Sequence, residues 1–183
     1  MPRENRTLDH ATFYQQLFQP VEERVGPLDP DTIVAIIGFD AGGPLNLCTV
    51  GRGTDEYVTY VSCELAVNVE QVASSLGRYE LMVTCDDEGW AREVLSELGR
   101  MTLEVEFDAG HTIDIGPWVE PSCPTQGLLF EEFCRARIGG DPVGIMNVIG
   151  VTRSQLEAAI EHGADAVIAE LKSRKTYART RTR

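Results

Sequence analysis

Residues 144–172 read GIMNVIGV, TRSQLEAAIEHG and ADAVIAELK, and this stretch decides the fold. The uncharged, largely apolar run 144–151 is typical of a buried strand. Thr152 and Gln155 have the spacing of a capping box, which marks a helix start, and Gly163 marks the helix end before a second apolar stripe begins. The sequence therefore predicts a core strand followed by two helices.

The apolar positions of these two helices form stripes that should face the strand. We expect five of them to pack the helices onto the strand around residues 145–149: Leu156, Ile160, Val167, Ile168 and Leu171. His162 lies at the end of the first helix, where a cation interacts favourably with the helix dipole.

Several short apolar runs upstream predict further strands. They lie at residues 32–39, 45–50, 57–63, 78–85 and 128–130, and a turn with a short strand is predicted over 108–117. The segment 51–55 predicts a tight turn that joins two of these strands in a hairpin. Residues 64–77 fit a short helix or an irregular connection equally well, so both interpretations stay open.

Two more helices are predicted nearer the N-terminus of the sequence. The acids at 86–88 precede an apolar stripe over 90–98, as the positive end of a helix dipole favours. Asp9 is a candidate cap for a helix over 9–19, and Pro20 is expected to end that helix.

About seven strands and four helices without a regular βαβ repeat predict an α+β fold, with a mixed β-sheet flanked by helices. We assign residues 1–173 to a single domain and residues 174–183 to a basic C-terminal tail. The tail has too little apolar material to offset its ordering entropy. We therefore expect it to lie outside the folded core, trailing in solvent or folding back on acidic residues.

Charge limits the classes of partner. The net charge is −13, and because six basic and no acidic residues lie in 172–183, residues 1–171 carry −19. Such a field repels nucleic acid and membrane surfaces and attracts basic partners, although it also serves solubility alone. No apolar run is long enough to span a membrane and the first residues are polar, so we expect a cytoplasmic protein.

Neither cysteine spacing nor motifs indicate a metal or a cofactor. The five cysteines are odd in number and lack the spacing of a zinc site, and we expect Cys63 and Cys85 to be reduced, small hydrophobic core residues. No glycine-rich phosphate loop is present, and none of the three histidines is spaced to pair on one helix face. The sequence predicts no cofactor, no metal site and no enzyme activity.

The acids at 86–88 could act as a general acid and base, or they could only stabilise a helix start. Asp114 alternates with buried-type neighbours and is expected on a solvated strand face. Trp118 lies in a loop that Pro117, Pro121 and Pro124 hold extended, and it could form an interaction surface or a core plug. Our candidate binding residues are Asp86, Asp87, Glu88, Asp114, Trp118 and Glu120.

A second hypothesis comes from another class of protein. The turn at Asp108–His111 and the loop at Pro117–Pro124 could line a cleft for a small molecule, which would make the chain a ligand-binding protein or an enzyme. The sequence decides neither the ligand nor the oligomeric state.

The sequence of residues 56–177 resembles those of the suppressor of fused domain family. The strongest match is the segment 150–172, supported by Tyr57–Leu65, Tyr79–Thr84, Trp90–Leu98 and Gly110–Ile113 in that order. The resemblance implies an α+β domain with a mixed central sheet flanked by helices. After Lys172 the family often continues through a Gly-Val-Tyr-Pro-like turn, from which this chain departs.

The resemblance also implies a role in binding another protein rather than in catalysis. Animal members hold a transcription factor inactive with the help of a further C-terminal domain that this sequence does not contain. Some bacterial members accompany toxin systems as immunity proteins, which neutralise a toxin by binding it. Our first hypothesis is therefore a non-catalytic protein-binding module, with a basic toxin domain as the candidate partner.

Overall fold

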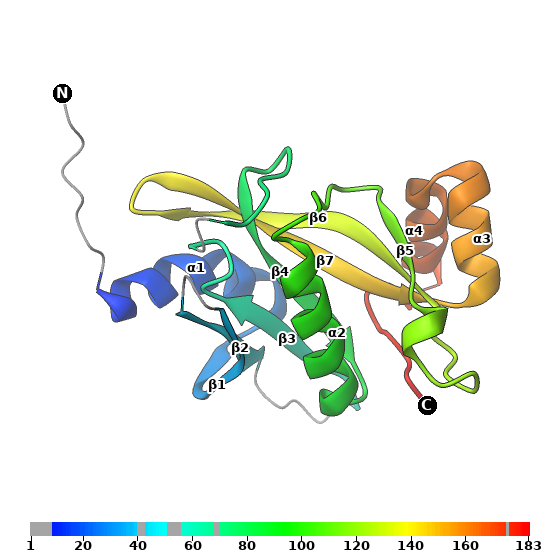
Figure 1. Cartoon of the computed structure of the whole chain (residues 1–183), viewed down its shortest axis with the longest axis horizontal. Helices are drawn as coiled ribbons and strands as arrows, with labels where there is room; N and C mark the ends of the chain where they lie inside the picture. Colours follow the sequence, from blue (N-terminus) through cyan, green and yellow to red (C-terminus); the bar gives the residue numbers. More distant parts are fainter. Residues whose placement is uncertain (1–8, 40–42, 51–55, 68–69, 175) are drawn as a thin grey trace.

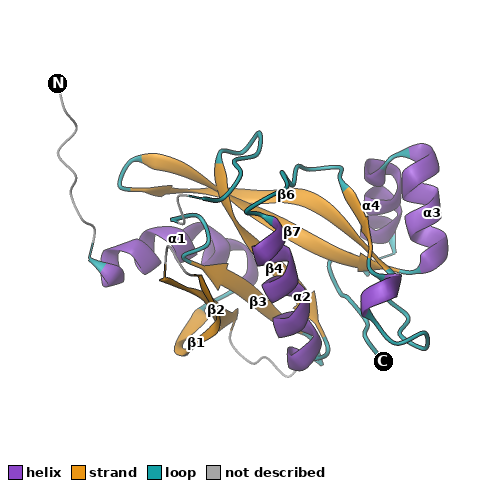
Figure 2. Ribbon diagram, viewed as in Figure 1, coloured by secondary structure: helices purple, strands orange, loops and turns teal. Residues whose placement is uncertain are grey.

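One seven-stranded sheet, in the order β1-β2-β3-β4-β7-β6-β5, organises the chain (Figures 1 and 2). The computed structural model describes residues 9–39, 43–50, 56–67, 70–174 and 176–183. The strands are β1 (Leu28–Phe39), β2 (Gly43–Val50), β3 (Val58–Cys63), β4 (Arg78–Cys85), β5 (Thr112–Asp114), β6 (Gly127–Ile138) and β7 (Asp141–Val151). The α-helices are α1 (His10–Val25), α2 (Glu88–Met101), α3 (Arg153–His162) and α4 (Ala164–Ser173), and a short 3-10 turn, η1, spans Gly116–Trp118.

Parallel and antiparallel pairing are combined in this sheet. All neighbouring strands are antiparallel except β4 and β7, which run parallel from Arg78 opposite Val143 to Val83 opposite Val148. The α+β class with a mixed, helix-flanked sheet is thus confirmed. The predicted turn at 51–55 lies outside the described residues, but β2 and β3 are antiparallel neighbours, as a hairpin requires.

Helices cover both faces of the sheet. Leu81 and Val83 of β4 point to the side that α2 covers, whereas Met82 between them packs with α1 on the other side. Figure 1 shows α2 lying across the front of β3 and β4, with α1 behind the sheet. Both faces of the central strands are therefore buried, which explains their nearly continuous apolar sequence.

The α3–α4 pair packs beyond α1, at the end of β7. Thr152 caps α3 with the predicted capping box, in which Thr152 and Gln155 bond each other's backbone N–H. The side chains of Leu156, Val167, Ile168 and Leu171 are buried here as predicted. The prediction for Ile160 is wrong: its side chain is 69% exposed, because the buried stripe of α3 runs through Leu156 and Ala159 and Ile160 is turned about 100° away from Ala159.

The N-terminal helix is longer than predicted, because α1 continues through Pro20 to Val25. Asp9 caps it, with a carboxylate oxygen 2.9 Å from the backbone nitrogen of Thr12. Proline removes one backbone hydrogen bond, but the residues around it anchor the helix in the core: Phe13, Leu17, Phe18 and Val21. Tertiary packing therefore outweighs the local cost that Pro20 imposes.

A buried carboxyl organises the connection whose structure the sequence left open. The described residues of 64–77 form turns and bends rather than a helix. Glu80 of β4 is fully buried and accepts hydrogen bonds from Ser62 Oγ (2.6 Å) and from the backbone N–H groups of Leu65 (3.2 Å) and Ala66 (2.9 Å). Burial raises the pKa of Glu80 to about 8, and the three hydrogen bonds oppose this shift.

The basic tail folds back on the acidic residues Asp86 and Asp87, as one of the two expected alternatives had it, but the expectation that it lies outside the core is wrong. Thr180 is 0% exposed and sits where β4 and β7 diverge. Its N–H donates to the carbonyl of Thr84 (2.8 Å), and its hydroxyl accepts from the N–H of Gly150 (2.9 Å). Only glycine fits at 150, since a Cβ there would lie 2.2 Å from the Thr180 methyl. Specific backbone and hydroxyl pairing, which composition does not reveal, orders this segment.

Candidate functional site

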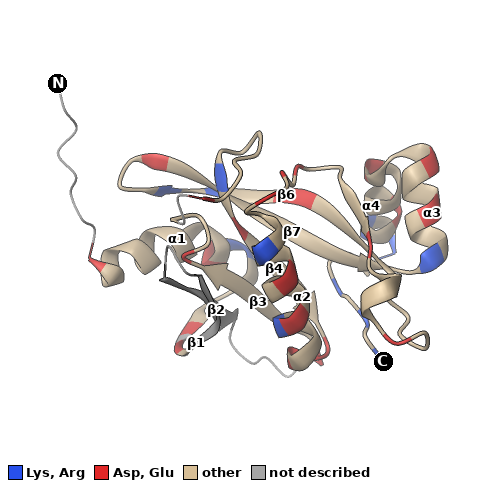
Figure 3. Cartoon of the chain, viewed as in Figure 1, with Lys and Arg blue, Asp and Glu red and all other residues tan. Residues whose placement is uncertain are grey.

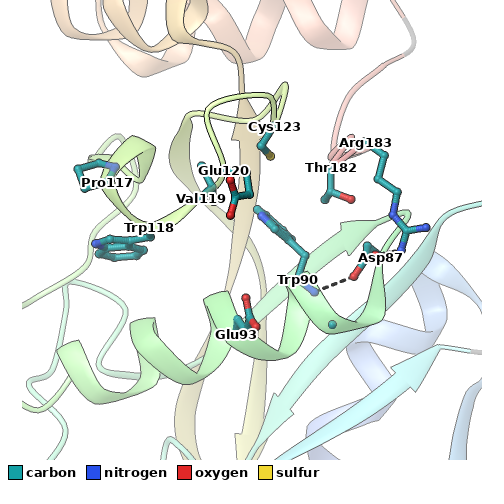
Figure 4. A pocket seen from close by; sticks show the side chains of 11 residues that line it. Asp87, Trp90, Glu93, Pro117, Trp118, Val119, Glu120, Cys123, Thr182 and Arg183 are labelled. Atoms are coloured by element: carbon teal, nitrogen blue, oxygen red, sulfur yellow. Dashed lines mark hydrogen bonds and ion pairs between the residues drawn. The ribbon is translucent and has the colours of Figure 1, made fainter.

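A groove beside the first half of α2 brings together three segments that are distant in sequence (Figure 4). It encloses about 570 Å³ between α2, the loop that follows β5, and the end of the tail. We call it the α2 groove; it is lined by Asp87, Gly89, Trp90, Glu93, Pro117, Trp118, Val119, Glu120, Cys123, Thr182 and Arg183.

The helix forms the floor of the α2 groove. Asp87 is the N-cap of α2, and its carboxylate accepts a hydrogen bond from the backbone N–H of Trp90 (2.8 Å). Trp90 then projects from the first turn into the groove, and Glu93 follows one turn later (Figure 4). The indole Nε1 of Trp90 is buried and, within the described part of the chain, has no hydrogen-bond acceptor.

The loop wall is held rigidly by an ion pair outside the groove. Asp114 accepts two hydrogen bonds from the Arg153 guanidinium (2.7 and 2.8 Å) and a third from the N–H of Gly116 (2.8 Å). These bonds hold the pKa of Asp114 below its usual range. They fix the start of η1, whose last residue is Trp118, so that this side chain stays 43% exposed at the groove wall.

The end of the tail closes the third side. Asp86 accepts hydrogen bonds from the backbone N–H (2.9 Å) and the hydroxyl (2.6 Å) of Thr182. Arg183 forms an ion pair with Asp87 inside the groove. One of the acids at the start of α2 is therefore paired with an arginine from the chain's own tail.

The remaining acids of the groove face solvent. Glu93 on the helix and Glu120 on the loop are exposed, and neither side-chain carboxylate has an ion pair or hydrogen bond among the residues that the structure describes. Figure 3 shows both acidic and basic positions along α2, where Arg92 pairs with Glu88 and Arg100 pairs with Glu97. Unpaired negative charge thus gathers on the side of α2 that faces the loop.

The six predicted binding residues separate into two groups. Asp87, Trp118 and Glu120 line the groove together. The other three make contacts within the chain: Asp86 holds Thr182, Glu88 pairs with Arg92 (2.5 Å), and Asp114 pairs with Arg153. The assignment of all six to a binding surface remains a prediction, and the side chains of Glu88 and Asp114 stay 50% exposed beside their ion pairs.

Sequence reasoning missed two groove residues on α2, Trp90 and Glu93, because the helical stripe placed Trp90 in the core. A signal was present: residues three apart share one helix face, so Trp90 and Glu93 had to project together. The contribution of Arg183 could not be found in this way, since its position depends on the buried Thr180.

The turn at Asp108–His111 and the loop at Pro117–Pro124 do not line one common cleft, as the second hypothesis expected. His111 lines a separate hollow of about 410 Å³ with Met101 and Phe107, whereas the 117–123 loop lines the α2 groove. Cys85, at the end of β4, is buried and its pKa is raised to about 12, mainly by desolvation. As predicted, Cys63 and Cys85 are small buried core residues.

Comparison with protein families gives one clear match. The sequence model of a family described as "Suppressor of fused protein (SUFU)" matches residues 43–181, about three quarters of the chain. A search of curated proteins finds no significant match. Of the helices that the structure describes, none combines the length and apolar character needed to cross a membrane.

Two solved structures share the fold. One is described as "the Sufu-Fu complex crystal structure"; it matches with a TM-score of 0.67 and 15% identity, over 94% of this chain and 88% of that chain. The other is the crystal structure of Drosophila Suppressor of Fused, with a TM-score of 0.57 and 16% identity. That match covers 78% of this chain but only 42% of the Drosophila chain, so the present chain spans less than half of its length.

Proposed function

The chain belongs to the suppressor of fused family, and on that premise we propose that it is a non-catalytic protein-binding module that contacts its partner through the α2 groove. One observation carries the proposal: Trp118 is exposed beside two carboxylates, Glu93 and Glu120, that have no partner within the described chain. Exposed aromatic side chains on rigid loops are typical of interface anchors.

Two further observations support binding to a protein. The structure with the higher TM-score is described as a complex, that of Sufu with Fu. The net charge of −13 favours a basic partner through faster association and disfavours nucleic acid and anionic membranes.

The finer proposal is an immunity function in the cytoplasm. We propose that the partner is a basic toxin domain and that the protein neutralises it by occupying its surface. An acidic inhibitor gains association rate from its charge, which suits neutralisation of a toxin before it acts.

Binding is tested with the products of the neighbouring genes. Each product is purified and titrated against the full chain by calorimetry, and we expect one to bind with a Kd below about 1 µM. The affinity should fall as salt rises, because exposed charges are screened. Elution of the protein alone from its source cells, together with no product binding below about 1 µM, would refute the proposal.

Matched variants place the contact. Trp118→Ala should weaken binding about tenfold or more, as loss of an aromatic anchor does. Glu104→Gln, an exposed acid beyond the other end of α2, should leave the affinity unchanged. If both variants bind alike, the contact surface lies elsewhere.

The immunity function has its own assay. In cells that express a toxic neighbouring gene, coexpression of this chain should restore growth, and the Trp118→Ala variant should restore it less. Growth that stays arrested although the two proteins bind would exclude the immunity function and retain the binding function.

A further inference from the structure

We infer that the α2 groove is a site for an arginine side chain on an extended segment of the partner, held between Trp90 and Trp118 and neutralised by Glu93 and Glu120. This inference rests on the proposed function, because it names the chemistry of the partner at the same surface.

The walls of the groove suit a flat cation. In the view of Figure 4, Trp118 and Trp90 lie on opposite sides of the hollow, with Glu120 and Glu93 above and below it. A smaller adjoining hollow of about 230 Å³ is lined by three of these residues, Trp90, Glu93 and Trp118, together with Val94, Glu97 and Val119. Indole faces attract cations, and tryptophan does so best among the aromatic side chains.

The carboxylates of Glu93 and Glu120 would neutralise the positive charge of a bound arginine. A guanidinium presents five N–H donors in a plane, which lets it stack on an indole and still donate to a carboxylate at its edge. Glu93 comes from α2 and Glu120 from the loop, so one cation between them would join the two walls. Lysine can form the ion pair but cannot stack and donate in this way.

The chain's own tail already places an arginine in this groove. Arg183 lines the hollow and pairs with Asp87, while Thr182 beside it is held by Asp86. The groove therefore accepts an extended segment with alternating threonine and arginine at one end. The seat at Glu93 and Glu120 offers the same chemistry and has no occupant from the described chain.

The indole N–H of Trp90 needs an acceptor of its own. Its Nε1 is buried and unpartnered in the described structure, although a buried donor without an acceptor is costly. Neither arginine nor lysine has an acceptor on its side chain. Because this atom is shielded from solvent in the unbound protein, a backbone carbonyl of the bound segment would reach it once the Trp90 ring shifts, and such an acceptor favours an arginine within a peptide over a free cation.

The two tryptophans of the chain make a direct assay possible. Both line the groove, so intrinsic tryptophan fluorescence reports on this site alone. The probes are three blocked peptides of sequence Thr-Xaa-Thr in which Xaa is arginine, lysine or citrulline, the neutral isostere of arginine. We expect saturable quenching or a spectral shift with the arginine peptide, severalfold weaker binding of the lysine peptide, and at least about tenfold weaker binding of the citrulline peptide.

Variants test the two carboxylates. The double variant Glu93→Gln with Glu120→Gln should weaken the arginine peptide about tenfold, whereas Glu104→Gln should have no effect. Equal binding of the arginine and citrulline peptides, or unchanged binding by the double variant, would overturn the inference. Because all three acids are exposed, none of these changes should impair folding.

The outcomes separate the inference from the proposed function. If a partner protein binds the double variant as well as the unmodified chain, the arginine site is wrong and the binding function stands. If the arginine peptide binds with the expected selectivity but no partner protein binds, the site stands and the proposed function fails.

Discussion

Two acidic regions of this protein use carboxyl groups in opposite ways. Glu80 is buried in the sheet, where donors from its own chain surround it. In the α2 groove, Glu93 and Glu120 are exposed and have no partner among the described residues. Acids whose hydrogen-bonding capacity is used internally should affect stability, and acids left open should affect binding.

The largest effect should come from Glu80→Gln. The amide presents an NH₂ group where the carboxyl accepts a bond, so at least one buried donor loses its acceptor. We expect a loss of about 1–3 kcal/mol in the free energy of unfolding. Urea denaturation measures it, with Glu104→Gln as the control that should change stability by less than about 0.5 kcal/mol.

The same variant has a predicted pH dependence. The pKa of Glu80 in the fold is about 8, above the value of 4.5 for an ordinary glutamate, so the folded state binds this proton more tightly than the unfolded chain does. Its contribution is present below pH 4.5 and is lost as pH rises towards 8. The stability difference between the unmodified chain and Glu80→Gln should therefore narrow between pH 5 and pH 8. A constant difference would mean that Glu80 is already ionised at low pH.

Deleting residues 176–183 should have the next largest effect. The deletion removes the buried Thr180 and its bonds to Thr84 and Gly150. We expect a loss on the order of 1–2 kcal/mol, or a fall of roughly 2–8 °C in melting temperature. Arg183→Ala alone removes an ion pair whose arginine is 78% exposed and should cost less than about 1 kcal/mol. Equal effects of the two changes would show that Thr180 contributes little.

A smaller loss of stability is expected at Asp87, the N-cap of α2, which also lines the groove. Asp87 both caps α2 and pairs with Arg183. Asp87→Ala should cost about 1 kcal/mol, whereas Asp87→Ser keeps a capping oxygen and should recover most of it. Thermal unfolding compares the two. If serine gives no recovery, the ion pair rather than the cap carries the stabilisation.

The smallest effect on stability should come from Glu93→Gln. Its side chain is exposed and bonds to nothing in the described chain, so the free energy of unfolding should change by less than about 0.5 kcal/mol. A larger loss would show that Glu93 belongs with Glu80 as a structural acid and would contradict the contrast between the two regions.

The strands and helix starts that depend on neighbouring residues could be predicted from the sequence. The apolar run at 144–151, the capping box at Thr152 and the acidic start of α2 all lie where expected. The helix end predicted at Pro20 was wrong because burial of Val21 keeps the helix intact. The burial of Thr180 could not be predicted because its two hydrogen bonds reach strands that are far away in sequence. Only part of the groove could be predicted from the sequence. Single residues such as Trp118 stand out, but tertiary structure brings them together with Trp90 and Arg183.

The parallel pairing of β4 with β7 divides the sheet into two halves. Within the group β1 to β4, and within the group β5 to β7, all neighbouring strands are antiparallel. The two groups meet only at the parallel pair of β4 and β7, which we call the seam. Paired residues across the seam are 65 positions apart in sequence, compared with 21 for Val61 and Met82 within one half, so closing the seam costs about 1 kcal/mol more chain entropy. We therefore expect each half to gain protection from hydrogen exchange before the seam does during refolding, which makes the joining of the halves the slow step.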